Sequence, residues 1–595
     1  MPFAMMESLK FKVFQLSRFM KQLLFFCCIL IFACNNNPPL PEISMDDQVR
    51  NFGLYDQEGD FHRMYYYDDA KAVVLFVQGN GCPIVRKSLN RFQDLAAEYS
   101  EKGVLFFMIN SNLQDSRESV KEEADAFGIE LPVLIDEDQL VADLLDIRIT
   151  AESFVLDPKD WKIKYRGPMD DKMGYEAERA SVKEPFLANA LDKMLDGESI
   201  EEPYIAAKGC AVSRMKDRES YTELTYTDDI APILRDNCVK CHQEGGIAPW
   251  PMNGYPMVAG WSAMMREVLM TQRMPPWQAD PHYGVFKNDI SIDQDELRKI
   301  VAWINGGVKK GDGEDILASL PPTAQEWKMG EPDFILELDQ EDIPANGIID
   351  YRYQTHSMAF DEDVFVKAYE VKPGNNAVLH HVLASVEYPS GMELPFERPR
   401  GEWLDGILIG WAPGGEPEEF PQGSGRRVPA GSKIHYQLHY TTSGKEESDN
   451  TRIGFYFHED RPDKEFVVMG PANFEFEIPP GTKDLPVVAN EPINRAINLY
   501  AMLPHMHYRG KSMDYVAHYP DGTQEILLSV ANYNFNWQRF YYLDEPKYLP
   551  VGTTLTVNAV FDNSTQNQFN PDPSKTIYFG EQTFDEMMIG YMSFT

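Results

Sequence analysis

Residues 72–85 read AVVLFVQGNGCPIV, and this stretch decides the fold of the first part of the chain. The run at 72–78 is apolar almost throughout, as in a strand that is buried on both faces of a parallel sheet. Gly79-Asn80-Gly81 forms a turn, and Cys82-Pro83 then begins a helix that should extend to about Tyr99. The helix has a thiol at its N-terminus, where the helix dipole favours the thiolate.

The segments that follow alternate between strands and helices, which predicts an α/β domain. The expected strands are residues 104–110, 131–135, 153–156 and 162–165. This pattern, with Gly-x-x-Cys at the turn before the helix, resembles the thioredoxin-like redoxin and peroxiredoxin-like family over residues 34–212. The resemblance implies a thioredoxin-like fold with its thiol at Cys82.

Two departures from that family concern its dithiol chemistry. Val85 stands where a Cys-x-x-Cys pair has its second cysteine, and Thr150-Ala151 replaces the family's Thr-Pro. Cys210 is the other thiol that remains once the cysteines of the leader and of a later motif are set aside. Cys82 and Cys210 are therefore a redox couple, a structural bridge or two inert thiols, and the residues leave these alternatives open.

The N-terminus looks like an export signal. Basic residues precede an apolar run from Leu23 to Ala33, which is too short to span a bilayer comfortably. Ala33-Cys34 at its end resembles the bacterial lipobox, so residues 1–33 would be a lipoprotein signal peptide and Cys34 the lipidated residue; the alternative is an ordinary signal peptide. The resemblance implies a lipid-anchored protein of the bacterial cell envelope, on its periplasmic or outer-membrane face.

The composition limits the partners. The chain has 595 residues, 43% of them apolar, which is enough for several domain cores. Its formal charge is −38, from 55 basic and 93 acidic residues. Such a charge argues against nucleic acid as a partner, because the phosphate backbone binds basic surfaces.

Cys238-Val239-Lys240-Cys241-His242 is the Cys-x-x-Cys-His motif of covalent haem c attachment. Two thiols at this spacing add to the haem vinyl groups, and the next residue, His242, supplies a nitrogen to the iron. We expect an all-α cytochrome c domain over residues 218–315. Met274-Pro275-Pro276-Trp277 resembles a bacterial cytochrome c family, which implies Met274 as the distal ligand. Its rivals are Met252, Met257, Met264, Met265 and Met270.

The remainder of the chain alternates in short runs separated by turn residues, which predicts β-sandwiches. At this length we expect two all-β domains of jelly-roll type, at residues 325–485 and 486–595. His505-Met506-His507 points both imidazoles to one face of a strand, a frequent arrangement for copper. His380-His381 and His439 form further clusters.

Together these clusters resemble the copper type II, ascorbate-dependent monooxygenases of the peptidylglycine- and dopamine β-hydroxylating class. The resemblance implies two coppers. The ligands of the electron-transfer copper would be His380, His381 and His439, with His435 as an alternative. Those of the catalytic copper would be His505, His507 and Met587, with Met588 as an alternative. Leu503 stands where the peptide enzymes have the arginine that binds substrate carboxylate, so a C-terminal glycine peptide is not the expected substrate.

This assembly predicts an oxidoreductase that uses O2 to hydroxylate a C–H bond of a small organic or peptide substrate. Because bacteria commonly lack ascorbate, the haem would relay electrons from a donor protein or a small reductant. Two alternatives remain. One is a copper-binding electron-transfer protein at the cell surface without substrate turnover, and the other is a thiol peroxidase-type oxidoreductase fused to a cytochrome.

Overall fold

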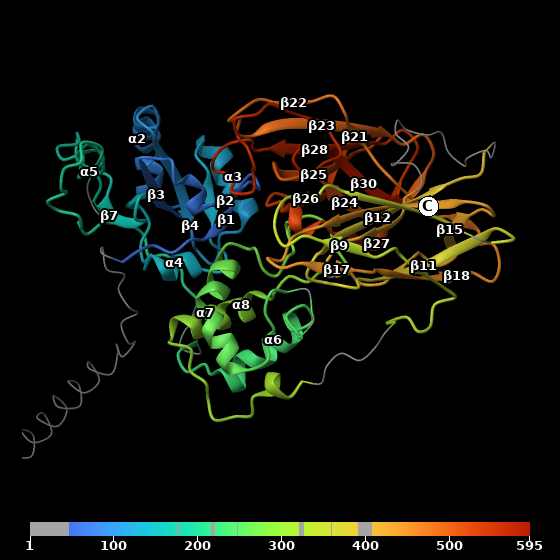
Figure 1. The fold of residues 1–595 in the computed structure, drawn as a ribbon. Coiled ribbons are helices and arrows are strands. Elements are labelled where there is room, and N and C mark those ends of the chain that lie inside the picture. The colour runs from blue at the N-terminus through green and yellow to red at the C-terminus, as the bar shows by residue number, and fades with distance from the viewer. Residues whose placement is uncertain are drawn as a thin grey trace, which may run out of the picture.

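The computed structural model describes residues 47–174, 178–215, 221–244, 246, 248–320, 327–358, 360–390, 407–413 and 415–595. The chain is multidomain, with an N-terminal thioredoxin-like α/β domain, a small helical region and two β-sandwiches. In Figure 1 the α/β domain is blue to cyan, the helical region is green and the sandwiches are yellow to red. No helix within the described ranges is both long and apolar enough to cross a membrane.

The α/β domain is built on a five-stranded sheet in the order β5-β4-β3-β6-β7. Its strands are β3 (Ala72–Gln78), β4 (Val104–Asn110), β5 (Val133–Ile135), β6 (Glu152–Asp157) and β7 (Lys162–Pro168). As the apolar run predicted, β3 is buried along its whole length. It pairs parallel with β4 and antiparallel with β6.

The two faces of β3 pack into different cores. Val74 and Phe76 pack with α2 (Pro83–Ser100), whereas Val73 and Leu75 face a second core around Trp161. The remaining elements of this domain are the hairpin β1 (Gly53–Tyr55) and β2 (Phe61–Arg63), the short helix η1 (Met64–Tyr67), and the helices α3 (Arg117–Phe127), α4 (Leu140–Leu144) and α5 (Phe186–Leu195). Cys82 is the N-cap residue of α2, as the sequence predicted.

The helical region has one small core formed around Trp303 and Tyr226. Its elements are η3 (Tyr226–Ile230), α6 (Ala231–Asn237), α7 (Tyr255–Met270), α8 (Gln294–Asn305) and η4 (Ile316–Ser319). Between α7 and α8, the extended segment at residues 277–289 leaves the helices and lies along the second sandwich. There Phe286 bridges to Leu543, and the Lys287 amide donates to the Tyr542 carbonyl at 2.9 Å.

The first sandwich packs two main sheets against each other. One has the order β10-β16-β12-β13, with β10 (Arg352–Ser357), β16 (Lys433–Tyr440), β12 (Leu379–Glu387) and β13 (Ile407–Trp411). The other has the order β19-β15-β11-β18-β8, with β19 (Lys464–Glu465), β15 (Ser424–Val428), β11 (Val364–Lys372), β18 (Arg452–Phe457) and β8 (Phe334–Glu337), and β14 (Glu418–Glu419) pairs with β11. A small pair joins β9 (Glu341–Ile343) and β17 (Glu447–Asp449).

The second sandwich also has two main sheets. One has the order β20-β30-β24-β27, with β20 (Val467–Met469), β30 (Met588–Phe594), β24 (Ile497–His505) and β27 (Tyr541–Leu549), and β21 (Ala472–Asn473) pairs with β30. The other has the order β23-β28-β25-β26, with β23 (Leu485–Pro492), β28 (Thr554–Phe561), β25 (Gly510–His518) and β26 (Gln524–Val530). The short strands β22 (Glu477–Ile478) and β29 (Ile577–Tyr578) pair, and η5 (Phe535–Trp537) precedes β27.

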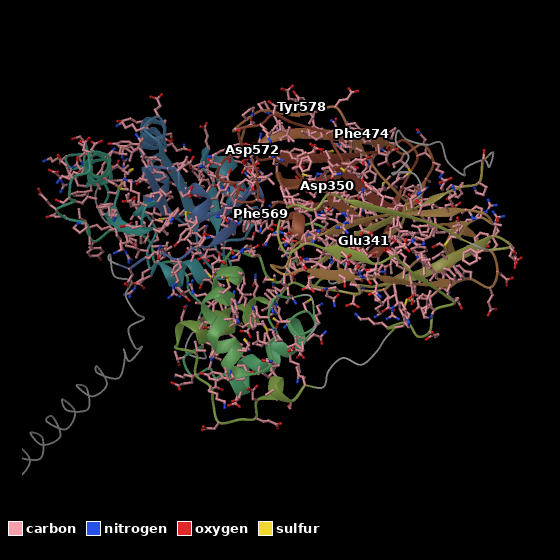
Figure 2. All side chains as sticks on the ribbon, in the orientation of Figure 1. Glu341, Asp350, Phe474, Phe569, Asp572 and Tyr578 are labelled. Carbon is pink, nitrogen blue, oxygen red and sulfur yellow. The ribbon has the colours of Figure 1, made fainter. Side chains whose placement is uncertain are left out.

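This topology corrects one predicted boundary. We placed the start of the second sandwich at residue 486, but β20 and β21 already pair with β30. The last strand of the chain needs these partners to complete its sheet, so the second sandwich begins before residue 470. Buried apolar side chains form the core of each sandwich. Figure 2 draws the side chains on the ribbon.

Candidate metal centres

The first centre is a cluster of three buried histidines on neighbouring strands. His380 and His381 lie on β12 and His439 on β16, where His381 is the register partner of His439. Adjacent residues of a regular strand point to opposite faces, but the register of β12 shifts between Leu379 and His381. The irregularity lets both neighbours turn toward His439, and one ligand atom from each ring lies within 4.8 Å of the others.

Burial keeps these imidazoles neutral. It lowers the pKa of His380 to about 4 and those of His381 and His439 well below their ordinary value, with the neighbouring histidines adding to the effect for the latter two. The Nε2 atoms of His380 and His381 are buried without a hydrogen-bond partner. Neutral imidazole nitrogens that converge in a dry site are ligands for a transition metal such as copper. The three residues are therefore a candidate copper site.

The second cluster forms where β24 ends. His505 is the last residue of β24 and His507 follows two residues later, with 5.3 Å between their ring centroids. The His505 Nδ1–H donates to Oε1 of Gln538, which turns Nε2 toward Met587 Sδ at 3.3 Å. The His507 Nδ1–H donates to the Asp585 carbonyl at 3.3 Å, and its Nε2 is buried without a partner.

Two residues that position this cluster were not predicted from the sequence. Glu586 is fully buried and its carboxylate accepts from the amides of His507 at 2.8 Å and Arg509 at 2.6 Å. Burial raises the pKa of Glu586 to about 8. Gln538 comes from the loop before β27. Glu586 directly precedes the predicted ligand Met587 in the sequence, whereas no spacing in the sequence connects Gln538 with His505.

Two aromatic rings, those of Tyr351 and Phe535, contact both clusters. The Tyr351 ring centroid lies 4.9 Å from that of His439 and 6.5 Å from that of His507. Phe535 stacks on His380 at 5.1 Å and meets His507 at 5.9 Å. The structure thus brings together five of the predicted histidines and Met587 in one region.

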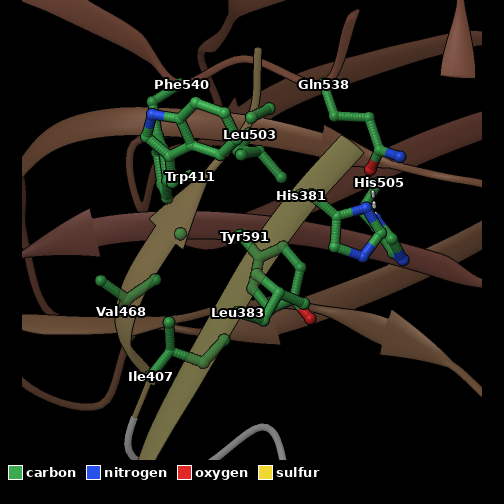
Figure 3. A pocket seen from close by; sticks show the side chains of 12 residues that line it. His381, Leu383, Ile407, Trp411, Val468, Leu503, His505, Gln538, Phe540 and Tyr591 are labelled. Carbon is green, nitrogen blue, oxygen red and sulfur yellow. Dashed lines mark hydrogen bonds between the residues drawn. The ribbon is translucent and has the colours of Figure 1, made fainter. Parts of the chain in front are cut away.

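A cavity of about 40 Å³ opens beside both clusters (Figure 3). His381 and His505 lie on one side of it, and Trp411 and Phe540 on the other. Most of its wall is apolar, and Leu503, which replaces the family's arginine, is part of that wall. None of the 12 described residues that line it is Lys, Arg, Asp or Glu.

The alternative ligands lie elsewhere. His435 lies on the same face of β16 as His439 but four residues along the strand, where it hydrogen-bonds Thr355 and Glu387 instead of joining the cluster. Met588 is fully buried in the core of the second sandwich, because consecutive residues of β30 face opposite sides. Cys34, the predicted lipidation site, lies outside the described residues.

The Cys-x-x-Cys-His motif faces a larger cavity of about 880 Å³ between the helical region and the first sandwich. Cys241 and His242 line it, and the Cys238 and Cys241 thiols are free. The His242 Nδ1–H donates to the Trp250 carbonyl at 3.0 Å, and burial lowers the pKa of His242. The ring is therefore neutral with Nε2 available, the form that an axial haem ligand requires.

The structure does not bring the predicted distal ligand to this cavity. Met274 lines a different cavity, of about 360 Å³, together with Tyr55 and Arg117 of the α/β domain. The chain leaves α7 at Met270 and is then held by Trp277, which packs on Tyr541 at 4.8 Å, so Met274 is carried away from His242. Met252, a rival candidate, does line the cavity with His242.

A third group of reactive residues lies in the α/β domain. Cys82 Sγ is 2.8 Å from Cys210 Sγ and 3.1 Å from Thr150 Oγ1. The segment around Cys210 pairs with the chain at 148–150, where the Thr150 amide donates to the Cys210 carbonyl at 2.9 Å. Burial opposes ionisation of Cys82, but hydrogen bonds from Cys210, Thr150 and backbone amides outweigh it, and the pKa of Cys82 is lowered.

Two sequence families match parts of the chain. The AhpC/TSA family matches residues 45–166, and the family "copper type II ascorbate-dependent monooxygenase, C-terminal domain" matches residues 476–595. The latter range contains His505, His507 and Met587. The chain therefore has a redoxin domain and a copper monooxygenase-like domain, and the candidate copper site of three histidines lies in the sandwich that precedes the matched range.

Individual proteins are similar to parts of the chain. The chain is 27% identical to the thiol-disulfide oxidoreductase ResA of Halalkalibacterium halodurans over 128 residues, 21% of this chain and 71% of ResA. It is 22% identical to the DBH-like monooxygenase protein 1 of Homo sapiens over 254 residues, 37% of this chain, and spans 40% of the human protein. A crystal structure of an uncharacterized conserved protein from Geobacillus kaustophilus is 31% identical, with 28% of this chain and 91% of that chain covered and a TM-score of 0.26.

The redoxin and monooxygenase-like domains indicate that the protein is an oxidoreductase.

Proposed function

We propose that this protein is a copper-dependent monooxygenase that hydroxylates a C–H bond of a small organic or peptide substrate with O2. The observation that carries the proposal is that five buried, neutral histidines and Met587 lie together around the rings of Tyr351 and Phe535. In this proposal His380, His381 and His439 hold one copper, and His505, His507 and Met587 hold the catalytic copper. Copper at such sites supplies one-electron chemistry and activation of O2.

The residues around the clusters orient the metal ligands and form the wall of the candidate substrate site. Gln538 and the Asp585 carbonyl fix His505 and His507 so that their Nε2 atoms remain available. The cavity beside His381 and His505 is mostly apolar, and none of the described residues that line it carries a charge that could pair with a substrate carboxylate. The substrate group that enters it is therefore expected to be small, uncharged and apolar.

We also propose that the motif at 238–242 carries haem c, which supplies one-electron transfer when bound. The 880 Å³ cavity, the free thiols and the neutral His242 fit this group. We propose Met252 rather than Met274 as the sixth ligand, because it is the methionine in the described chain that lines this cavity. Electrons would come from a donor protein or a small reductant, and the anchor at Cys34 would hold the protein at the bacterial cell envelope.

Metal analysis of protein from a haem-maturing host tests the proposal. We expect two coppers and one haem per chain, and one copper in each of the variants His439→Ala and His507→Ala. His435→Ala is the matched control and should retain both coppers, because His435 lies four residues along β16 from His439 and hydrogen-bonds Thr355 and Glu387 instead. Wild-type protein that binds no copper after loading would disprove the copper function.

A second function is favoured by the 2.8 Å separation of Cys82 Sγ and Cys210 Sγ. We propose that the pair exchanges with a protein disulfide. The Cys82 thiolate attacks the partner's disulfide, and Cys210 then displaces the partner, so that a Cys82–Cys210 disulfide forms and the partner leaves with two thiols. The chain's pair loses two electrons, which the partner's disulfide gains.

Trapping distinguishes this couple from inert thiols. Cys210→Ser should accumulate a mixed disulfide with a disulfide-containing test protein, because the resolving thiol is gone. Cys82→Ser should accumulate none, since the attacking thiolate is missing. If neither variant forms a mixed disulfide, the pair does not perform exchange.

A further inference from the structure

Trp411 belongs to both cavities that border the candidate redox centres. It lines the cavity beside His381 and His505, and it also lines the large cavity that holds Cys241 and His242. The side chain is buried, so the indole is part of the wall between the two spaces. Figure 3 shows it on the side of the small cavity opposite the two histidines.

The backbone connects Trp411 to the three-histidine cluster as well. Trp411 is the last residue of β13, and its register partner on β12 is Val382, the residue that follows His381. The route from the indole to the cluster therefore crosses one pair of hydrogen-bonded strands.

Neighbouring residues hold the indole in place. A Cβ at Gly415 would lie 2.9 Å from Cδ1 and Nε1 of Trp411, so only glycine permits this close approach of the chain to the indole edge. Phe540 packs on Gly410, the residue before Trp411 on the strand, where an added Cβ would lie 3.0 Å from the Phe540 ring. Trp411 therefore has little freedom to change its position.

The loop that carries Phe540 reaches the same centres. Gln538 holds His505, and Phe535 stacks on His380. The loop at residues 535–540 therefore contacts both histidine clusters and, through Phe540, the wall of the small cavity that Trp411 also lines.

The helical region is fixed against the sandwiches, which keeps the Cys-x-x-Cys-His motif at a constant position relative to the histidine clusters. Asn288 Nδ2 donates to the Phe540 carbonyl at 2.8 Å, and the Tyr542 amide donates to Asn288 Oδ1 at 3.0 Å. Asp280 and Phe286 add a backbone hydrogen bond and a β-bridge to the second sandwich. The distance between the two cavities is therefore set by the fold.

We propose that Trp411 is the relay residue through which electrons pass from the haem cavity to the copper clusters. This inference rests on the proposed function, since it needs both haem and copper to be bound. The step moves one electron: ferrous haem iron becomes ferric and Cu(II) becomes Cu(I), and no bond of Trp411 forms or breaks. The indole is a π-system in the wall between the two cavities. It divides the path of the electron into two shorter steps.

The test follows haem oxidation directly. Protein with haem and Cu(II) is reduced anaerobically with one electron per haem, and the haem absorbance band and the Cu(II) paramagnetic signal are followed by rapid mixing and freezing. Trp411→Leu should slow ferrous haem oxidation by about tenfold or more, and Trp411→Phe should slow it less. Trp327→Leu is the matched control, because Trp327 is equally buried in the first sandwich and lines neither cavity.

The outcomes separate the relay from the function on which it rests. Copper content, the haem spectrum and direct reduction of Cu(II) by ascorbate should be unchanged in Trp411→Leu. Unchanged haem oxidation in a copper-loaded Trp411→Leu variant would overturn the relay and leave the proposed function intact. Wild-type protein in which Cu(II) does not oxidise the haem would overturn the relay together with the haem's proposed role, and wild-type protein that binds no copper would overturn the copper function as well.

Discussion

At the scale of single residues, Gln538 decides which nitrogen of His505 is presented to a metal. Its Oε1 accepts from the His505 Nδ1–H, while its own Nε2 donates to the Phe535 carbonyl at 3.2 Å, so the amide orientation is determined on both sides. Such partners of metal ligands raise affinity by fixing the tautomer and the ring orientation.

We therefore expect Gln538→Leu to weaken Cu(I) binding at the His505 cluster by about 10- to 100-fold. Competition with a chromophoric Cu(I) chelator measures this affinity. Gln538→Glu should bind nearly as well as wild type, because a carboxylate oxygen still accepts from Nδ1–H. Equal affinities for Gln538→Leu and wild type would show that the hydrogen bond has no such role.

The two thiols of the α/β domain should titrate very differently. The pKa of Cys82 is lowered from its ordinary 9.0, because its hydrogen bonds outweigh burial. Burial and the neighbouring Cys82 raise the pKa of Cys210 to about 11. As pH rises, Cys82 therefore loses its proton first, and Cys210 stays a thiol until strongly alkaline pH.

Exchange of reduced protein with a small aromatic disulfide should follow this order. We expect the rate to reach half its plateau at a pH below 9.0 in wild type and in Cys210→Ser, because Cys82 is the attacking thiolate. In Cys82→Ser the rise should move to higher pH. Stopped-flow absorbance of the released thiolate measures both profiles, and identical profiles would contradict the assignment of Cys82 as the nucleophile.

At the scale of elements, the extended segment at residues 277–289 attaches the helical region to the second sandwich. Phe286 is its main anchor, since its ring packs on Trp277 at 5.9 Å and on Tyr541 at 5.7 Å. Val285, its neighbour, is 72% exposed.

Phe286→Ala should weaken this attachment by about 3 kcal/mol, because a buried aromatic ring is lost. We expect faster proteolytic cleavage within residues 277–289, measured by limited digestion and mass spectrometry, while both sandwiches stay folded. Val285→Ala should digest like wild type, as its side chain faces solvent. Equal cleavage of Phe286→Ala and wild type would mean that other contacts hold the segment.

At the scale of the whole molecule, a buried ion pair joins the α/β domain to the same segment. Arg117 of α3 lies 2.6 Å from Asp280, and both side chains are almost fully buried. Asp280 also accepts from His282. The pair thus links parts of the chain that are far apart in sequence.

Arg117→Met should destabilise the folded protein by about 3–5 kcal/mol, because it leaves the Asp280 charge buried without its partner. Arg117→Met/Asp280→Asn should recover part of the loss. The control is Lys121→Met on the same helix, whose ion pair with Glu58 is exposed to solvent and should contribute little to stability. Urea unfolding followed by circular dichroism measures all three, and a double variant as unstable as Arg117→Met would contradict this account.

The sequence by itself determined the features that depend on short-range order. The apolar run at 72–78 is a buried strand with Cys82 at the start of the next helix, because strand burial and helix capping are local. The two-residue spacing of His505 and His507 predicted that their rings share one face of a strand; the ring centroids are 5.3 Å apart, but β24 ends at His505 and His507 lies beyond the strand. The spacing of Cys238, Cys241 and His242 likewise predicts haem c attachment without any knowledge of the fold.

Tertiary structure alone decided which distant residues meet. Cys210 reaches Cys82 because the segment after α5 returns along residues 148–150, and Met274 leaves the cavity of His242 because Trp277 is packed against Tyr541. Gln538 and Trp411 join the candidate metal centres through loop closure and strand register, which no local pattern encodes. Such contacts depend on the free energy of packing the whole chain, so they become visible only in the folded molecule.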